Sequence, residues 1–152
     1  MLPGSASRAF PEIPGIVRIH HVAIVVRDAE AAAETYRRAL GVEPMAFEEY
    51  RGTAKVAFLR AGDTLLELIE PLTDDGPWAA ALRGRGEGAH HFALEVVDLR
   101  AAVAALGASG IGFLDPRPSR GTGNTLSVFL DPSSTGGAVI ELVQQIQIRG
   151  AS

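Results

Sequence analysis

Residues 17–26 read VRIHHVAIVV, and residues 90–97 read HHFALEVV, a second segment of the same kind. Both are rich in β-branched residues, which predicts a strand. Each is followed by an Asp, a run of good helix formers and a Gly, which are the ordinary signals for a capped helix and its C-terminal stop. We expect these helices at 31–40 and 99–106. The chain therefore repeats one pattern, and this repeat decides the fold.

Shorter strand candidates follow each helix. In the first half they are Met45–Tyr50, Lys55–Arg60 and Thr64–Ile69; in the second half Leu126–Leu130 and Ala138–Gln144 match the last two. The predicted fold class is α+β, with two βαβββ modules in tandem that form one curved mixed sheet around a cleft, helices outside. We expect a flexible N-terminal tail at 1–16, modules at 17–72 and 89–147, a linker at 73–88 with a short helix around Trp78–Leu82, and a C-terminal tail at 148–152.

The composition excludes several classes of protein. The 152 residues suffice for one domain, or for two small modules that share a core. No apolar run approaches the roughly 20 residues of a membrane span, and the N-terminal residues do not resemble a signal peptide. The formal charge of −4, without a Lys/Arg cluster, gives no footprint for nucleic acid. We expect a cytoplasmic protein whose partners are small molecules, with no nucleic acid and no membrane among them.

Two histidines and two glutamates occupy equivalent places in the two repeats. Side chains alternate between the faces of a strand, so the bulky apolar row of each strand should face the helix and leave the other face open. This alternation places His21 and His91 on the open face. It places Glu67 in LLELIEP and Glu141 in AVIELVQ on that face as well.

These four side chains predict a metal site. A buried ionised carboxylate without a partner costs several kcal/mol, so Glu67 and Glu141 need a compensating cation or a proton. The chain has no cysteine, so a metal ion would need His, carboxylate and water ligands. Two imidazoles and two carboxylates suit one divalent ion, Zn, Co, Ni, Mn or Fe. We predict that His21, Glu67, His91 and Glu141 bind it.

A structural role is the more common one for any of these residues taken singly, and only their repetition in two modules favours a metal. For His20 and His90 we expect packing at the strand edge or orientation of the neighbouring histidine. We expect Glu70 to be a solvated charge at a strand end.

Several segments resemble the vicinal oxygen chelate (glyoxalase/bleomycin resistance/dioxygenase) superfamily, and within it the methylmalonyl-CoA epimerases. They are IHHVAIVV (19–26), KVAFLRAGDTLLELIEPL (55–72), GPWAAAL (76–82), RGEGAHHFALEV (85–96) and GTGNTLSVFLDPSSTGGAVIELVQ (121–144). The resemblance implies the same four metal ligands and a homodimer. It also implies epimerisation at C2 of methylmalonyl-CoA, or of a related acyl thioester, through a metal-stabilised enolate.

Epimerisation needs a base on one face of the reacting carbon and an acid on the other. By similarity, Glu141 is the first candidate for one of them. Some family members carry a second glutamate on the strand that reads AKVAFL here, where this chain has Val56. Glu67, or Glu48 on the neighbouring strand, would then serve, although surface charge is the simpler interpretation of Glu48. The chain also has Asp-Pro-Ser at 131–133, where epimerases often show His-Pro-Lys, so a basic group for the CoA phosphates is missing.

Two other functions remain open from the sequence. One is a different metal-dependent reaction on the same fold, such as a glyoxalase I-like isomerase, a dioxygenase, or a biosynthetic isomerase or cyclase. The other is a metal-free protein that binds small molecules. A fold alone does not separate them, because one fold hosts many functions.

Overall fold

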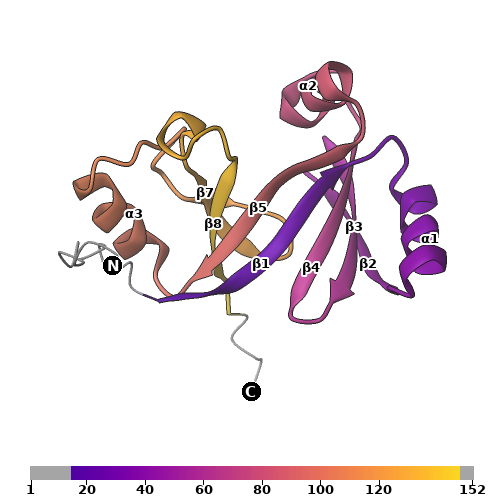
Figure 1. The fold of residues 1–152 in the computed structure, drawn as a ribbon, viewed down its shortest axis with the longest axis horizontal. Coiled ribbons are helices and arrows are strands. Elements are labelled where there is room, and N and C mark those ends of the chain that lie inside the picture. Colours follow the sequence, from indigo (N-terminus) through magenta and orange to yellow (C-terminus); the bar gives the residue numbers. More distant parts are fainter. Residues whose placement is uncertain (1–14, 148–152) are drawn as a thin grey trace, which may run out of the picture.

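Residues 15–147 are described by a computed structural model, and they form one eight-stranded sheet with helices at its ends (Figure 1). The first half contains β1 (Ile16–Val25), α1 (Ala29–Leu40), β2 (Pro44–Tyr50), β3 (Ala54–Ala61) and β4 (Thr64–Pro71). Next come α2 (Gly76–Arg85), β5 (Gly88–Val96), α3 (Leu99–Ala108), β6 (Ser119–Arg120), β7 (Thr125–Phe129), the single 3₁₀ turn η1 (Pro132–Ser134) and β8 (Ile140–Gln145). Apart from Gly15 and Ile16, the predicted tails lie outside the described residues.

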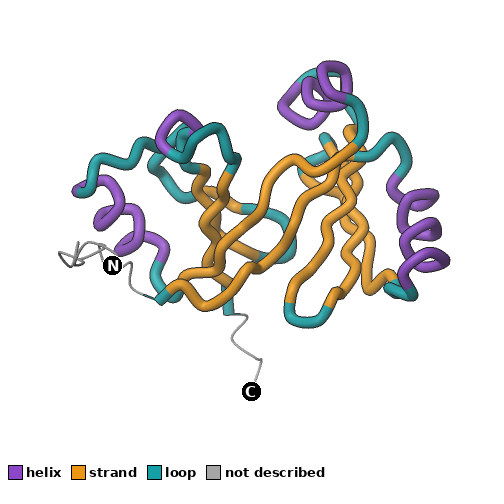
Figure 2. The backbone as a smooth tube through the Cα atoms, in the orientation of Figure 1, coloured by secondary structure: helices purple, strands orange, loops and turns teal. Residues whose placement is uncertain are grey.

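The strand order confirms the predicted pair of modules. It is β2-β3-β4-β1-β5-β8-β7-β6, with β1 parallel to β4, β5 parallel to β8, and β1 antiparallel to β5 at the centre. The strands curl together, with α1 and α3 at opposite ends of the sheet (Figure 2). The first strand of each module therefore lies beside that of the other, and the two modules share one surface.

The helix ends mostly follow their sequence signals. The Asp28 and Asp98 carboxylates accept hydrogen bonds from backbone N–H groups in the first turns of α1 and α3. α3 continues through Gly107, its predicted stop, and Gly110 adopts the left-handed backbone instead, with φ 85°. Glu70 is not a solvated charge as predicted, because it accepts a hydrogen bond from Ala29 N at 2.9 Å and adds negative charge at the α1 N-terminus.

Alternation along the strands separates the two faces of the sheet as predicted. One face of β4 packs Leu66 and Leu68 against α1, and one face of β8 packs Leu142 against α3. The opposite face gathers Ala23, Val56, Phe58 and Ile69, with Trp78 of α2 packed against them. The face away from α1 and α3 is therefore the one on which the site lies.

The second module departs from the first in one strand. β6 has only two residues, and Phe113 makes an isolated bridge to Leu130 nearby. Pro116 and Pro118 lie between these two points and have no N–H to donate to a sheet. None of the described helices has the length and apolar character that crossing a membrane requires.

Candidate metal and active site

The predicted ligands come from four strands that are adjacent in the sheet, β4, β1, β5 and β8, and they are Glu67, His21, His91 and Glu141. In the strand register, Ala23 is the partner of both Glu67 and His91. Ala93 is likewise the partner of both His21 and Glu141. Both alanines are fully buried, and their small side chains leave the space that the four larger ones fill.

Three of the predicted ligands converge on one point. Nε2 of His21 and Nε2 of His91 each lie 3.0 Å from Oε2 of Glu141. All three residues are buried, with 2–6% of their surface exposed. Among the described residues, Nε2 of His21 makes no hydrogen bond, although Oε2 of Glu141 lies 3.0 Å away. A buried nitrogen lone pair facing a carboxylate fits a bound cation, and the nitrogen and oxygen donors suit a divalent transition metal.

Glu67 lies on the other side of His21. Its Oε1 atom is 3.5 Å from Nδ1 of His21, and Oγ1 of Thr122 donates to its two oxygens at 3.1 and 3.0 Å. Donor atoms within 4.8 Å of one another form two overlapping groups, one of His21, His91 and Glu141, the other of His20, His21 and Glu67. A ligand role for Glu67 therefore stays a prediction.

Burial and neighbouring charges drive the two carboxylates apart in proton affinity. Burial raises the pKa of Glu67 to about 7, and the charges of Glu141 and Glu48 add to this effect. Burial acts in the same direction on Glu141, but the imidazoles of His21 and His91 outweigh it and hold its pKa at about 2. Burial acts to lower the pKa of His21, and Glu141 and Glu67 outweigh it and hold that pKa above its ordinary value. Such opposed environments are typical of functional sites.

The remaining two histidines contact the ligand histidines directly. Nδ1 of His20 lies 2.8 Å from Nδ1 of His21, and Nδ1 of His90 lies 2.8 Å from Nδ1 of His91. Burial first, and then the adjacent histidine, lowers the pKa of both outer residues, that of His90 to about 4. Strict alternation, which would have turned the two members of each doublet to opposite faces, is therefore wrong here. The contacts agree with the prediction that His20 and His90 orient the histidines next to them.

Glu48 lies toward the loop between β6 and β7, and its role as an acid or as a surface charge stays a prediction. Its β2 position pairs with Val56 of β3, and its Oε2 atom accepts a hydrogen bond from Gly123 N at 3.2 Å. It is half-buried, whereas Val56 is fully buried in the apolar cluster. β3 therefore places no acid here, but β2 does so directly beside it.

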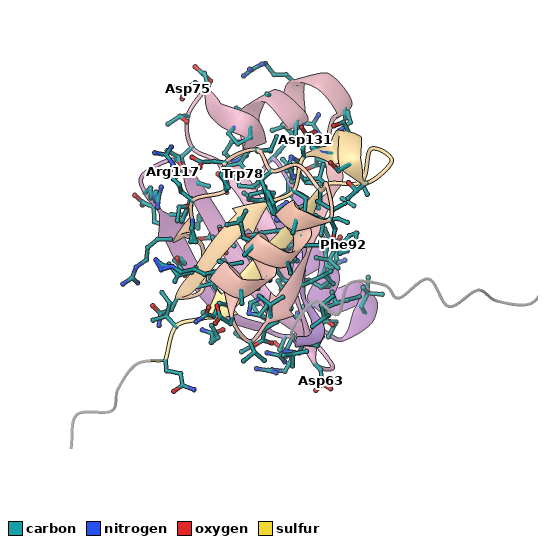
Figure 3. The ribbon with its side chains drawn as sticks, turned by 90° about the vertical axis from the view of Figure 1, so that its left-hand side faces the viewer. Asp63, Asp75, Trp78, Phe92, Arg117 and Asp131 are labelled. Atoms are coloured by element: carbon teal, nitrogen blue, oxygen red, sulfur yellow. The ribbon has the colours of Figure 1, made fainter. Side chains whose placement is uncertain are left out.

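Sequence reasoning missed the loop between β6 and β7, residues 121–124, and two aromatic side chains. The loop crosses to the first module, where Thr122 contacts Glu67. The hydroxyl of Tyr50 donates to the Arg120 carbonyl at 2.8 Å. Trp78 extends from α2 toward the strands (Figure 3) and stacks on His91 with ring centroids 5.7 Å apart and an angle of 27°. These residues do not repeat between the modules, so the duplication did not select them, although Trp78 and residues 121–124 lie in segments that resemble the family.

The family and the relatives that this chain matches agree with the resemblance seen in its sequence. The family model of the glyoxalase/bleomycin resistance protein/dioxygenase superfamily matches residues 20–129. The mitochondrial methylmalonyl-CoA epimerase of Homo sapiens is 34% identical over 148 residues, which cover 92% of this chain and 83% of that protein. The ethylmalonyl-CoA/methylmalonyl-CoA epimerase of Cereibacter sphaeroides is 37% identical over 132 residues, which cover 85% and 98%.

A solved structure is similar over nearly the whole described fold. It is a single-residue variant of the methylmalonyl-CoA epimerase of Streptomyces coelicolor in complex with 2-nitronate-propionyl-CoA. It is 30% identical, with a TM-score of 0.82, and the match covers 90% of this chain and all of that one.

Proposed function

Because the chain belongs to the glyoxalase/bleomycin resistance protein/dioxygenase superfamily, we propose that it is a metal-dependent epimerase. Its reaction interconverts the C2 stereoisomers of methylmalonyl-CoA or of a related acyl thioester. One observation carries the proposal: His21, His91 and Glu141 converge, buried, in a chain similar to such epimerases over most of its length.

His21, His91 and Glu141 would hold the metal, with Glu67 as the candidate fourth ligand. A bound divalent ion acts as a Lewis acid and stabilises the negative charge that develops on the substrate oxygens when C2 loses its proton. The unpartnered Nε2 of His21 supports a cation at this point. The residues are compatible with Zn, Co, Ni, Mn or Fe, because all of these accept mixed imidazole and carboxylate ligands.

The carboxylates supply the proton transfers. One carboxylate removes the C2 proton and leaves an enolate, and a carboxylic acid on the opposite face returns a proton to C2, which inverts the centre. Glu141 is the first candidate for one role. Glu48 is the candidate for the other, since it stands beside Val56 on the cleft side of β2. Glu67 is the alternative, because its buried carboxyl lines the same cavity as Glu141.

The dimensions of the site limit what can enter it. The cavity beside Glu67, His91 and Glu141 has a volume of about 80 Å³, so it accommodates only the reacting end of a CoA thioester. The Asp131–Ser133 segment, where the family often has a lysine, forms a turn in which Asp131 accepts from Ser133 N. We therefore expect the nucleotide of CoA to add little affinity through this segment, and pantetheine thioesters to react at a comparable rate.

The decisive experiment is proton NMR of methylmalonyl-CoA in deuterated water with the metal-loaded protein. We expect rapid exchange of the C2 hydrogen by the wild type and a loss of at least 100-fold in Glu141→Gln and in Glu48→Gln, the size typical of a lost acid or base. Glu49→Gln is the matched control, because Glu49 is exposed beside Glu48 on β2. Metal content measured on each variant separates a lost proton transfer from a lost ion.

Failure of the wild type to exchange C2 hydrogen in methylmalonyl-CoA, in ethylmalonyl-CoA and in their pantetheine analogues would overturn the proposal. Turnover of hemithioacetals or catechols without that exchange would assign the chain to another reaction of its superfamily.

A further inference from the structure

The first histidine doublet lies at a β-bulge. In the ladder between β1 and β5, Ile19 and His21 pair with the consecutive residues Leu94 and Ala93. His20 is therefore the extra residue on β1. A bulge turns its extra side chain out of the regular alternation, and bulges are common beside active sites. Here it brings the two Nδ1 atoms of the doublet to 2.8 Å.

The second histidine doublet also lies at a β-bulge, this time on β5. His91 and Ala89 pair with the consecutive residues Ala23 and Ile24, so His90 is the extra residue on β5. The two Nδ1 atoms of this doublet are also 2.8 Å apart. Each module thus places one bulge histidine behind one ligand histidine, and its partner strand has no bulge at the same point.

Gln145 of β8 determines the direction of the hydrogen bonds behind His21. Its Nε2 atom donates to the carbonyl oxygens of Gly123 and Asn124, both at 3.2 Å. An amide nitrogen only donates, so these two carbonyls fix the orientation of the side chain. The Oε1 atom of Gln145 then faces Nε2 of His20 at 3.3 Å, and it can only accept.

The tautomers follow from this orientation. Nε2 of His20 must carry a hydrogen in order to donate to Gln145, so Nδ1 of the same neutral ring is a bare acceptor. Nδ1 of His21 therefore carries the hydrogen and donates to His20. In the neutral form of His21, Nε2 is then left without a hydrogen, and this is the atom that lies 3.0 Å from Glu141 and makes no hydrogen bond among the described residues.

We propose that Gln145 and His20 are positioning residues that hold His21 in the tautomer whose bare Nε2 faces the metal point. They act through His21 and touch neither metal nor substrate. Ligand histidines usually donate their second N–H to a carboxylate, a carbonyl or water, and loss of that partner weakens metal binding 10–100-fold. Here the imidazole of His20 fills this role, and the side-chain amide of Gln145, on β8 of the second module, orients it.

His90 holds the matching place behind His91 in the second module, with the two Nδ1 atoms 2.8 Å apart. Its ring packs edge-to-face on Trp78, with centroids 5.0 Å apart, so the bulge histidine is held by an aromatic ring in place of an amide. The repeat therefore predicts equal roles for His20 and His90, with different supports behind them.

The first test uses the metal-free protein, labelled with ¹⁵N at histidine. This inference depends on the metal site proposed above, but the tautomer is read without metal, so the two can fail separately. We expect the ring nitrogen shifts and couplings of His21 to show the Nδ1–H form in the wild type at pH 8. Gln145→Met should give a mixture of both forms, and Gln147→Met, an exposed change two residues on, should leave the spectrum unchanged.

The second test is the affinity for Co²⁺, measured by titration. We expect Kd to rise 10–100-fold in His20→Leu and in His90→Leu, and to recover at least partly in His20→Asn, whose carbonyl oxygen can accept from His21. Gln145→Met lies at an exposed position, so it tests the chain of hydrogen bonds even where a histidine variant does not fold. An Nε2–H form of His21 in the wild type, or Gln145→Met and His20→Leu both with unchanged tautomer and Kd, would overturn the proposal.

Discussion

Glu67→Gln should stabilise the metal-free protein at pH 8. The pKa of this carboxyl rises from 4.5 to about 7 on folding, chiefly because the group is buried. Each tenfold change in proton affinity corresponds to about 1.4 kcal/mol, so ionised Glu67 destabilises the fold by about 3 kcal/mol. Gln has the same shape and no charge, and it can keep the hydrogen bond from Thr122.

The pH dependence of stability follows from the direction of this pKa shift. Below pH 4.5, Glu67 is protonated in both the folded and the unfolded chain, so it adds no penalty. Between pH 4.5 and about 7 the folded protein keeps a proton that the unfolded chain has released, and stability falls as pH rises. Above about pH 7 the full penalty is present. The advantage of Glu67→Gln should therefore be absent at pH 4 and reach about 3 kcal/mol at pH 8.

Urea denaturation of the chelator-treated protein from pH 4 to pH 9 measures this difference directly. Glu49→Gln is the control, because an exposed carboxylate should change stability by less than about 0.5 kcal/mol at every pH. Saturating metal should reverse the order if Glu67 is a ligand, because the ion binds the carboxylate but not the amide as tightly. Equal stability of wild type and Glu67→Gln at pH 8 without metal would refute the electrostatic reasoning.

Four further outcomes are expected. Leu142→Ala, in the fully buried cluster under α3, should lower the free energy of unfolding by about 2–5 kcal/mol, and a loss under 1 kcal/mol in urea would contradict that packing. Asp28→Ala and Asp98→Ala should each destabilise the protein by about 1 kcal/mol and by similar amounts, because they cap equivalent helices; unequal calorimetric losses would contradict the equivalence. Gly121→Ala would place a Cβ atom 2.7 Å from Oγ1 of buried Thr125, so we expect a displaced loop and weaker Co²⁺ binding. Gly84→Ala is the comparison, because a Cβ atom there meets nothing within 4 Å and should leave binding intact. Chelator should lower the Tm of the metal-loaded protein, since metal at 100 times Kd stabilises the fold by about 3 kcal/mol. A Tm that chelator leaves unchanged would favour the alternative function, a metal-free protein that binds small molecules.

Local rules in the sequence determined the repeat, the order of the elements and the faces of the strands. Capping and strand alternation depend on neighbouring residues, so Asp28, Asp98 and the apolar rows of β4 and β8 could be read without coordinates. The convergence of His21, His91 and Glu141 followed from the same alternation, applied twice in a duplicated chain.

Only the tertiary structure decided what surrounds these ligands. Thr122 and Glu67 are separated by 55 residues and Glu48 and Gly123 by 75, so their hydrogen bonds depend on how the second module folds across the first. The contact between His20 and His21 depends on a bulge, and a bulge is a shift of register between two strands that leaves no mark on either one. Long-range pairing and register are collective properties of the packed sheet, and for that reason the metal-facing side chains were readable from the sequence, whereas the contacts between the two modules were not.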